Sequence, residues 1–438
     1  MALVFTSPKG PAGALIELDS PTGNILSPVV DLFGGPNPAF GQQAAWAINP
    51  GTGNDSNDGS PGAPLRTMAA FSARMSGQLV TVAQTLQLVG DVLDAPLWLR
   101  GTAYAAGASL TVTGTRTVLG TATINVVTPL GTAGTFPWQL TTTGINWTTA
   151  PLGSQLRFST GHVGFIAEVL GANDVVVGAI AAPGVSLAPI TPTVASTVDL
   201  VSLSRALPPL LIFSAQINNA AAVFLQDLSF DPPVAGGVNG YLFAGGGQTQ
   251  FFGCELRTAG VTFYVNAGLN LRACRWSFAA NNTANWRVGP DPSICSFCLV
   301  VAGNGSALFN CQVGSVLHIT ITLQGARLGC NRANLQLQGG HIRNTANPVL
   351  LNNGGALLLS SGVLNGSTGN TGIGIDVPLG LLSYIGAALK PTVTGTSDTR
   401  VGGIAKTYAQ IPYTNLELAS VPPLVTTLIG NGAAIVQE

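Results

Sequence analysis

The acidic residues in the middle of the chain are the best candidates for catalysis. Between residues 207 and 390 the acids are only Asp227, Asp231, Glu255, Asp291 and Asp376. Asp227 and Asp231 are four residues apart, a spacing that would place both side chains on one face of a strand. Glu255 follows in the segment that parallels theirs. Because a glycoside hydrolase needs two carboxylates across the scissile bond, an enzyme built from this chain would use Asp227, Asp231 and Glu255.

Two other interpretations of these acids stay open. A polysaccharide lyase would pair a base with basic side chains, and Arg257, Arg272 and Arg275 are near in sequence, but no acidic cage for calcium accompanies them. Alternatively, the acids are turn and surface residues, and this is the interpretation that we favour. No P-loop, Gly-x-Ser-x-Gly or His-Glu-x-x-His motif is present, so the sequence does not support a nucleotide-binding protein, an esterase or a zinc protease.

An oxygen-rich stretch near the N-terminus holds the candidates for a metal site, which are Asp55, Asn57 and Asp58. The complete EF-hand pattern is absent, because no Glu stands at its twelfth position. A turn held by hydrogen bonds from the Asx side chains is the simpler interpretation. We expect neither a metal nor a cofactor.

The six cysteines offer a second possible metal or redox site. Cys295 and Cys298 form a Cys-x-x-Cys pair, which by itself indicates zinc or redox chemistry only weakly. The alternative is that most of the cysteines are small apolar residues stacked in the core. The sequence predicts one inward column containing Cys254, Cys274, Cys311 and Cys330.

A repeat between residues 245 and 362 must position these side chains. Five segments share a glycine followed by an apolar run with a small residue at a fixed place, and the intervals between their cysteines are 20, 37 and 19 residues. Self-similarity at this period indicates a solenoid. Corners rich in Gly and Asn, and the absence of a 3.6-residue period, favour strands over helices. We therefore predict an all-β protein, a parallel β-helix whose turns stack about 4.8 Å apart.

The composition limits the possible partners. Only 8% of the residues are charged, and 17 basic against 18 acidic residues give a net charge of −1, which argues against binding of nucleic acid. No apolar run is long enough for a membrane span, and the start MALVFTSPKGP does not resemble a secretory signal. Because the surface would carry so few charges, we expect it to be buried in an oligomer or a larger assembly.

Changes in composition divide the chain into five parts. The predicted parts are an extended N-terminal arm at 1–44, a cap and first coil at 45–101, an inserted antiparallel β-barrel or sandwich at 102–206, the main parallel β-helix at 207–387, and a C-terminal assembly segment at 388–438. The arm and the C-terminal segment are rich in Pro and Gly and carry apolar residues that need cover.

The stretch AWAINPGTGNDSNDGSPGAPLRTMAAFSARM, residues 45–75, carries a resemblance to a known family. An Asn/Gly/Asp-rich loop leads to Thr67, a plausible N-cap, and to a short helix with Met68, Phe71 and Met75 on one face. This is similar to the cap of the first coil in pectate-lyase-like right-handed parallel β-helix proteins, and the style is that of bacteriophage tail spikes and other virion β-helix proteins. The resemblance covers about 30 residues and implies the fold rather than an activity.

These observations lead to three hypotheses on function. The first is a non-enzymatic structural spike or fibre protein of a virion or phage-like particle, involved in host attachment or particle stabilisation. The second is a tail-spike depolymerase, a glycosidase or lyase acting on a bacterial surface polysaccharide, and the third is a carbohydrate- or receptor-binding module without catalysis. The expected partners are two further copies in a homotrimer, other virion or tail proteins, and a host surface glycan. The resemblance is the reason for expecting three-fold symmetry.

Overall fold

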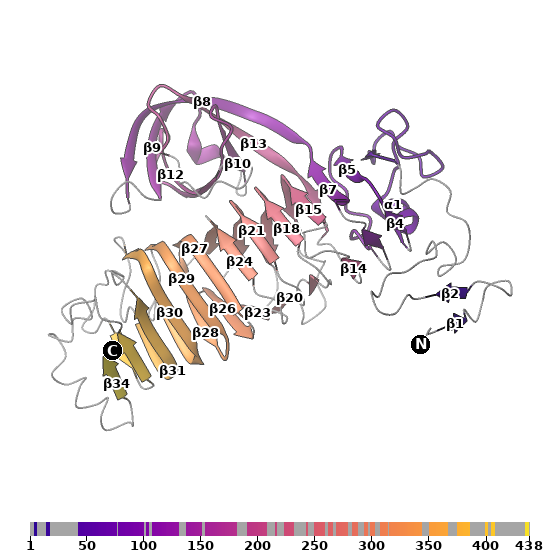
Figure 1. The fold of residues 1–438 in the computed structure, drawn as a ribbon. Helices are drawn as coiled ribbons and strands as arrows, with labels where there is room; N and C mark the ends of the chain where they lie inside the picture. The colour runs from indigo at the N-terminus through magenta and orange to yellow at the C-terminus, as the bar shows by residue number, and fades with distance from the viewer. Residues whose placement is uncertain are drawn as a thin grey trace.

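The computed structural model shows a nearly all-β protein, a parallel β-solenoid with an additional antiparallel sheet (Figure 1). The predicted fold class is therefore confirmed. The solenoid explains the sequence repeat, because each turn places equivalent residues above those of the turn before. The structure describes residues 4–6, 15–17, 43–76, 78–99, 102–104, 107–130, 137–150, 154–181, 191–207, 215–216, 223–231, 242–243, 249–258, 262–265, 269–278, 283–287, 293–296, 298–302, 307–313, 315–343, 350–366, 375–385, 399–401, 404–407 and 434–437.

The longest face of the solenoid is a ladder of parallel strands that begins near the N-terminus and ends near the C-terminus. Its members are in register, so each strand pairs with the equivalent strand of the next turn. The strands, in order along the ladder, are β3 (Ala45–Ile48), β5 (Ala83–Leu88), β7 (Ser109–Gly114), β15 (Val223–Gln226), β18 (Thr249–Phe252), β21 (Leu269–Arg272), β24 (Ser293–Ser296), β27 (Ser315–Gln324), β29 (Asn334–Arg343), β30 (Leu350–Gly366), β31 (Ile375–Ile385), β33 (Ile404–Thr407) and β34 (Ala434–Gln437).

Two further faces complete the turns. The second face carries the candidate carboxylates and continues into the later halves of β27, β29 and β30. Its strands are the end of β13 (Thr197–Ala206), β16 (Leu228–Phe230), β19 (Glu255–Thr258), β22 (Arg275–Phe278) and β25 (Leu299–Ala302). The third face, which takes in the first part of β30 and of β31, consists of β17 (Leu242–Phe243), β20 (Thr262–Val265), β23 (Thr283–Arg287), β26 (Ala307–Val313), β28 (Ala326–Asn331) and β32 (Thr399–Val401).

Two small sheets lie outside these faces. One is the parallel sheet of β4 (Leu79–Val80), β6 (Ala103–Tyr104) and β14 (Ala215–Gln216). The other is the antiparallel pair β1 (Val4–Thr6) and β2 (Leu15–Glu17), within the part predicted as an N-terminal arm. Residues 1–3, 7–14 and 18–42 of that arm lie outside the described residues.

The inserted domain is a closed antiparallel barrel. Six strands form a ring in which each pairs with two neighbours, in the order β8–β9–β12–β11–β10–β13 and back to β8. Closure leaves the barrel without a free sheet edge. Besides β13, the ring consists of β8 (Arg116–Pro129), β9 (Trp138–Thr143), β10 (Gln155–Phe158), β11 (Val163–Val169) and β12 (Asp174–Ala181), with a short 3₁₀ helix, η4 (Trp147–Thr149), after β9.

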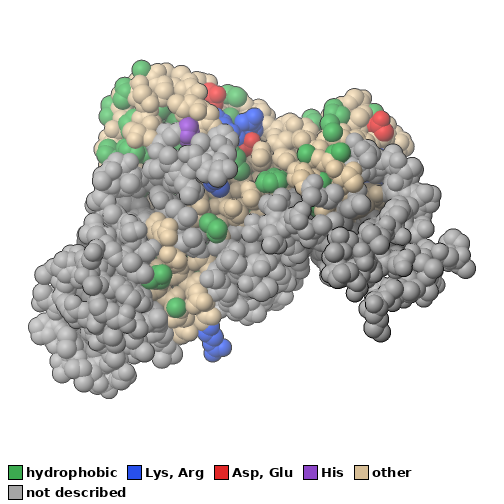
Figure 2. All heavy atoms as spheres, in the orientation of Figure 1, with side chains coloured by type: hydrophobic (Ala, Val, Ile, Leu, Met, Phe, Trp, Pro, Cys, Tyr) green, Lys and Arg blue, Asp and Glu red, His purple; other side chains and the backbone are tan. Residues whose placement is uncertain are grey.

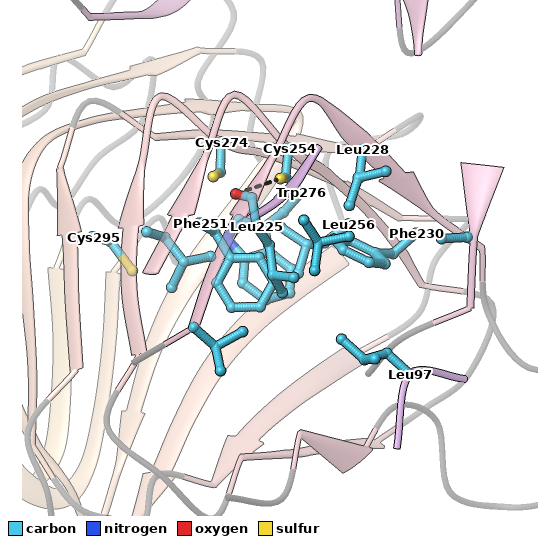
Figure 3. Close-up of a cluster of buried hydrophobic side chains, with 14 of the residues drawn as sticks. Leu97, Leu225, Leu228, Phe230, Phe251, Cys254, Leu256, Cys274, Trp276 and Cys295 are labelled. Atoms are coloured by element: carbon cyan, nitrogen blue, oxygen red, sulfur yellow. Dashed lines mark hydrogen bonds between the residues drawn. The ribbon is translucent and has the colours of Figure 1, made fainter. Parts of the chain in front are cut away.

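The solenoid core consists of columns of equivalent apolar side chains. On the second face, residues at alternate positions point inward, so Phe230, Leu256, Trp276 and Val300 lie above one another in successive turns. Figure 3 shows three of them together with Phe251 and Leu225 from the first face. Each is at most 2% exposed, and the burial of such side chains stabilises the fold by about 1.5–3 kcal/mol each.

A stack of left-handed corner residues separates the first face from the second. Asp227, Gly253 and Ala273 have φ angles of 54°, 62° and 47°, and the backbone N–H of each donates to a carbonyl of the next turn. Non-glycine residues rarely adopt this conformation, although Asp tolerates it better than most. The corner therefore sets Asp227 apart from the strands on either side of it.

The cysteines are all buried free thiols, but the prediction of a single column is wrong. Cys254, Cys274 and Cys298 follow the corner in successive turns, because the amides of Arg275 and Leu299 donate to the carbonyls of Cys254 and Cys274 at 2.9 Å. Figure 3 shows the side chains of Cys254 and Cys274 next to each other. The sequence intervals missed Cys298, because the turn that contains it is longer than its predecessor.

Cys311 and Cys330 belong to a different column, on the third face. They are direct register partners on β26 and β28. Burial raises the pKa of the Cys311 thiol, and it raises that of Cys330 to about 11. Both therefore behave as small apolar core residues at neutral pH.

The first coil is capped as predicted. The helix α1 (Met68–Met75) begins after Thr67, whose side chain accepts a hydrogen bond from the backbone N–H of Ala70 at 3.1 Å. Its buried residues are Met68, Phe71, Ser72 and Met75. The preceding loop covers the outer edge of β3, because Gly59 accepts from Ala47 and Leu65 accepts from Asn49, both at 2.8 Å. The cap thus satisfies the backbone groups that a solenoid exposes at its end.

The strand pairing differs from two of the boundaries drawn from the sequence. Within 102–206, β6 and β7 pair in parallel with coil strands, and the antiparallel strands begin only at β8. Within 388–438, β32, β33 and β34 continue the parallel ladder. The first boundary was misplaced because the alternating sequence SLTVTG in β7 suits parallel and antiparallel strands equally. The second was misplaced because residues 399–407 lack the glycine and cysteine pattern by which the repeat was recognised.

The described surface carries few charges, as the composition requires. Figure 2 shows the Lys, Arg, Asp and Glu side chains as isolated patches among uncharged ones. Among the described residues, no helix has the length and apolar character needed to span a membrane.

Candidate functional site

The candidate site is the outward side of the second face, where polar side chains lie in a column. The register places Arg205, Ser229, Glu255 and Arg275 above one another in successive turns. Because strand residues alternate, these side chains point away from the core that Phe230 and its equivalents fill. The inserted barrel covers part of this side, since β11 contacts β25 and β12 contacts β27.

Glu255 is a buried carboxylate with a full set of partners. It is 1% exposed, and it accepts hydrogen bonds from Ser229 Oγ at 3.1 Å and from Ser277 Oγ at 2.7 Å. Arg257 Nη2 donates to Glu255 Oε2 at 3.2 Å, and Arg275 Nη1 lies 3.8 Å from Oε1. Two hydroxyls and two guanidinium groups therefore surround the carboxylate.

Asp231 belongs to the same charge network. Its carboxylate accepts from Arg205, whose Nε is 2.8 Å from Oδ2, and from Arg257 Nη1 at 3.4 Å. Arg205 also forms an ion pair with Asp91 at 3.7 Å. Arg257 thus links Asp231 to Glu255, and the network alternates in charge along its whole length.

Asp227 makes contacts of another kind, because it binds the inserted barrel. Oδ1 accepts from Arg157 Nη2 and, at 3.1 Å, from Gln155 Nε2, both on β10. Arg116, at the start of β8, lies 3.9 Å from Oδ2. Gln155 Nε2 also donates to the carbonyl of Gly253 at 2.7 Å. We call these residues, Asp227, Arg157, Gln155 and Gly253, the clasp.

Burial acts on the arginines of both clusters. It lowers the pKa of Arg275, while the nearby Glu255 carboxylate opposes that shift. It also lowers the pKa of Arg157, against the attraction of Asp227. Arginine nevertheless stays protonated in proteins, so each buried carboxylate has a permanent positive partner. Each carboxylate is therefore part of a buried or half-buried ion pair.

The structure therefore brings together two of the three predicted catalytic acids. Asp231 and Glu255 share Arg257, while Asp227 is directed towards the barrel. The spacing argument from the sequence does not apply, because Asp227 and Asp231 flank β16 and neither lies in it. Chemically, the set can hold opposite charges in place, but each carboxylate already has an arginine on at least one oxygen.

The metal candidates make hydrogen bonds within the cap. Asp55 accepts from the amides of Arg66 and Thr67 and from the Thr67 hydroxyl, each at 2.9 Å. Asn57 donates to the carbonyl of Pro64, and Asp58 accepts from the amide of Ser60 at 2.8 Å. Within the described part of the chain, no group of three or more His, Cys, Asp and Glu side chains is arranged to hold a metal ion.

Several residues of these networks could not be found from the sequence. Asp91 lies 114 residues before Arg205, and Arg157 and Gln155 lie 70 and 72 residues before Asp227. None belongs to a motif. One indirect signal is the glycine at position 253. The side chain of Gln155 approaches the corner there so closely that a Cβ on residue 253 would lie 2.7 Å from Gln155 Nε2.

Comparison with known proteins gives similarity in structure only. No known protein family matches the sequence, and no curated protein matches it as a relative. A structure of XylC with xylose is 9% identical and matches over 83% of this chain and 74% of its own, with a TM-score of 0.35. The Gp54 tailspike of Acinetobacter baumannii bacteriophage AP22, in complex with capsular saccharide, is 10% identical over 76% of this chain and 64% of its own, with a TM-score of 0.24.

A further similar structure is a glycoside hydrolase, 9% identical over 81% of this chain and 96% of its own, with a TM-score of 0.24. The chain is a parallel β-helix protein. Its structural neighbours include a phage tailspike and a glycoside hydrolase.

Proposed function

We propose that this β-helix protein is a non-enzymatic spike or fibre protein of a virion or phage-like particle, with a role in host attachment or particle stabilisation. One observation carries the non-enzymatic part: each of the three candidate carboxylates is bound by arginine, and Asp227 and Glu255 are only 7% and 1% exposed. The repeat architecture and the scarcity of charge support a structural role in an assembly.

The chemical reason is that a glycosidase acid must reach the glycosidic oxygen and exchange a proton with it. Glu255 makes hydrogen bonds to two serines and Arg257, and the Asp227 carboxylate is turned towards β10. A substrate would have to displace these partners before either carboxylate could act. Asp231, at 13% side-chain exposure, is held by two arginines.

The proposal is tested by incubating the purified protein with capsular and envelope polysaccharides and measuring new reducing ends and unsaturated sugar products. We expect neither. Depolymerisation that Asp227→Asn, Asp231→Asn or Glu255→Gln abolishes in a folded variant would instead establish the depolymerase hypothesis. Binding of a glycan without cleavage, measured on a glycan array, would favour the carbohydrate-binding module.

The assembly part of the proposal is a homotrimer, or docking to other particle proteins, in which the N-terminal arm takes part. The arm contains Leu15, Ile16, Leu18, Val29, Val30, Leu32 and Phe33. Burial of even half of these side chains, at about 1.5–3 kcal/mol each, would offset much of a typical association cost of about 4–15 kcal/mol.

Light scattering tests this assembly. We expect the full chain to form a stable trimer at micromolar concentration, and deletion of residues 1–44 to weaken the trimer while the circular dichroism of the solenoid is retained. A soluble full-length monomer at that concentration would overturn this part of the proposal without affecting the result for the carboxylates.

A further inference from the structure

The inserted barrel is joined to the solenoid in a way that allows it to move. Its only covalent connections among the described residues are β8, which follows β7 after one residue, and β13. The two strands pair with each other in antiparallel fashion between the barrel and the solenoid, as Figure 1 shows. A two-stranded arm of this kind can bend as a unit without breaking its own hydrogen bonds.

The contact between barrel and solenoid is partly apolar. Phe165, Ala167 and Val176 on the outside of the barrel form one buried cluster with Leu299 on β25. Gly178 lies directly over the second face, where a Cβ would be 3.2 Å from Leu299 Cδ1 and 3.4 Å from Thr322 Cβ. This packing favours the closed position.

The same contact also leaves polar atoms unsatisfied. Arg275 Nε, Thr322 Oγ1 and Gln324 Oε1 are buried and have no hydrogen-bond partner among the described residues. The register places Arg275 and Thr322 on either side of Leu299, and Gln324 next to Val301. A buried polar atom without a partner destabilises the state in which it is buried. Opening of the contact would return Thr322 Oγ1, which lies beneath Gly178, to water and so would offset part of the loss of apolar packing.

The clasp is what holds the closed position against this cost. Asp227, at the corner of the solenoid, accepts hydrogen bonds from Arg157 and Gln155 on β10. It also forms ion pairs with Arg157 and Arg116, so all of these contacts join the barrel to the solenoid. Charge-assisted hydrogen bonds of this type are about twice as strong as neutral ones. They depend on one carboxylate, which the network around Asp231 and Glu255 does not share.

We propose that the barrel is a hinged lid over the second face of the solenoid, latched by Asp227. In the closed position it covers Leu299 and Thr322. In the open position this mixed polar and apolar face meets solvent, while the barrel and the solenoid each keep their own fold. The proposal does not depend on the function proposed above.

The test uses cysteine labelling with a maleimide in the folded full-length protein. Ala167→Cys places a thiol of similar size on the lid surface that faces the solenoid, where Ala167 is 6% exposed. Ala122→Cys places one inside the barrel core, where Ala122 is 1% exposed. We expect Cys at 167 to react well before Cys at 122, because opening exposes the first and only unfolding of the barrel exposes the second. Equal labelling rates would overturn the proposal.

Two matched variants test the latch itself. Asp227→Asn keeps a side chain that tolerates the corner conformation but removes the charge. Asp231→Asn removes one charge four residues away without touching the barrel. We expect the first to raise the labelling rate at position 167 by about tenfold or more, and the second to leave it unchanged. An unchanged rate in Asp227→Asn, or an equal rise in both variants, would show that Asp227 is not the latch.

A cross-link then closes the lid deliberately. The position of a Cβ on residue 178, 3.4 Å from Thr322 Cβ, is close to the spacing of a disulfide, so Gly178→Cys with Thr322→Cys should form one on oxidation. In the oxidised protein the labelling at position 167 should fall to the rate at position 122, and reduction should restore it. Persistent labelling in the cross-linked protein would contradict a lid hinged at β8 and β13.

Discussion

The barrel and the solenoid are both all-β, but they are built on opposite principles. In the solenoid, a residue packs against its equivalents in the neighbouring turns, as Trp276 does between Leu256 and Val300. In the barrel, antiparallel strands bring unlike residues together, so Trp138 and Trp147 each occupy an environment that occurs once. The solenoid repeats one packing arrangement from turn to turn along its axis. The barrel instead closes around a single core and has no free strand edge.

This difference has consequences for cooperativity. The stability of a solenoid is approximately a sum over turns and the interfaces between them, so damage to one turn should remain local. A small barrel with one core is expected to unfold as a unit. The clasp at Asp227 and Gly253 is where the two kinds of structure meet.

The largest effect is expected from Trp147→Ala, compared with Trp276→Ala. Both side chains are at most 1% exposed, and their removal should cost about 3–5 kcal/mol. In hydrogen exchange followed by mass spectrometry, Trp147→Ala should raise exchange in all six barrel strands together. Trp276→Ala should raise it mainly in the turns next to β22. If Trp276→Ala raised hydrogen exchange evenly along the whole solenoid, the proposed difference in cooperativity between solenoid and barrel would be wrong.

The next effect concerns the junction between the regions. Gly253→Ala should lower the free energy of unfolding by about 1–3 kcal/mol, because its φ of 62° is strained for Ala and the new Cβ would press on Gln155. Gly90→Ala is the control, since Gly90 has a φ of 84° with no atom within 4 Å of the added Cβ. Chemical denaturation measures both. A larger loss in Gly90→Ala would mean that the contact with the barrel is unimportant.

A third experiment tests the thiol columns of the solenoid. Cys311→Ser should cost about 1–3 kcal/mol, because it buries a hydroxyl in an apolar column, and Cys311→Ala serves as the volume control. Cys254→Ser should cost less, since Cys254 Sγ already donates to the carbonyl of Leu225 at 3.3 Å and a hydroxyl can take its place. Thermal unfolding ranks the three variants. All native thiols should resist alkylation until the protein unfolds.

The smallest effect is a pH dependence in the cap. Although partial burial acts to raise it, the hydrogen bonds from Thr67 and Arg66 lower the pKa of Asp55 below its usual value of 3.8. A carboxylate with a lowered folded-state pKa stabilises the fold above its unfolded-state pKa, and this contribution disappears as the pH falls through the folded-state pKa. The stability difference between the native chain and Asp55→Asn should therefore be full at neutral pH and shrink below pH 4. A difference that is constant between pH 7 and 3 would contradict this role.

The sequence by itself determined the solenoid and its cap. Glycines and small residues recur because each turn presents the same corner and the same inward position, so the fold leaves a period in the sequence. Thr67 and the apolar spacing of Met68, Phe71 and Met75 predicted α1 correctly because a helix depends on residues within one or two turns of each other. The barrel was visible only as alternating strands and turn signals, which suit a barrel and a sandwich equally.

Only the tertiary structure decided what the charged residues do. The sequence suggested that Glu255 is a turn or surface residue, whereas in the structure it is a buried, ion-paired carboxylate. Its partners Ser229 and Ser277 come from the neighbouring turns, and Arg275 is its register partner in the next turn. Asp227 meets Arg157 over 70 residues of intervening chain. Such partners are fixed by strand register and by the docking of the barrel. These are long-range contacts between segments with no shared pattern, and no local spacing in the sequence records them.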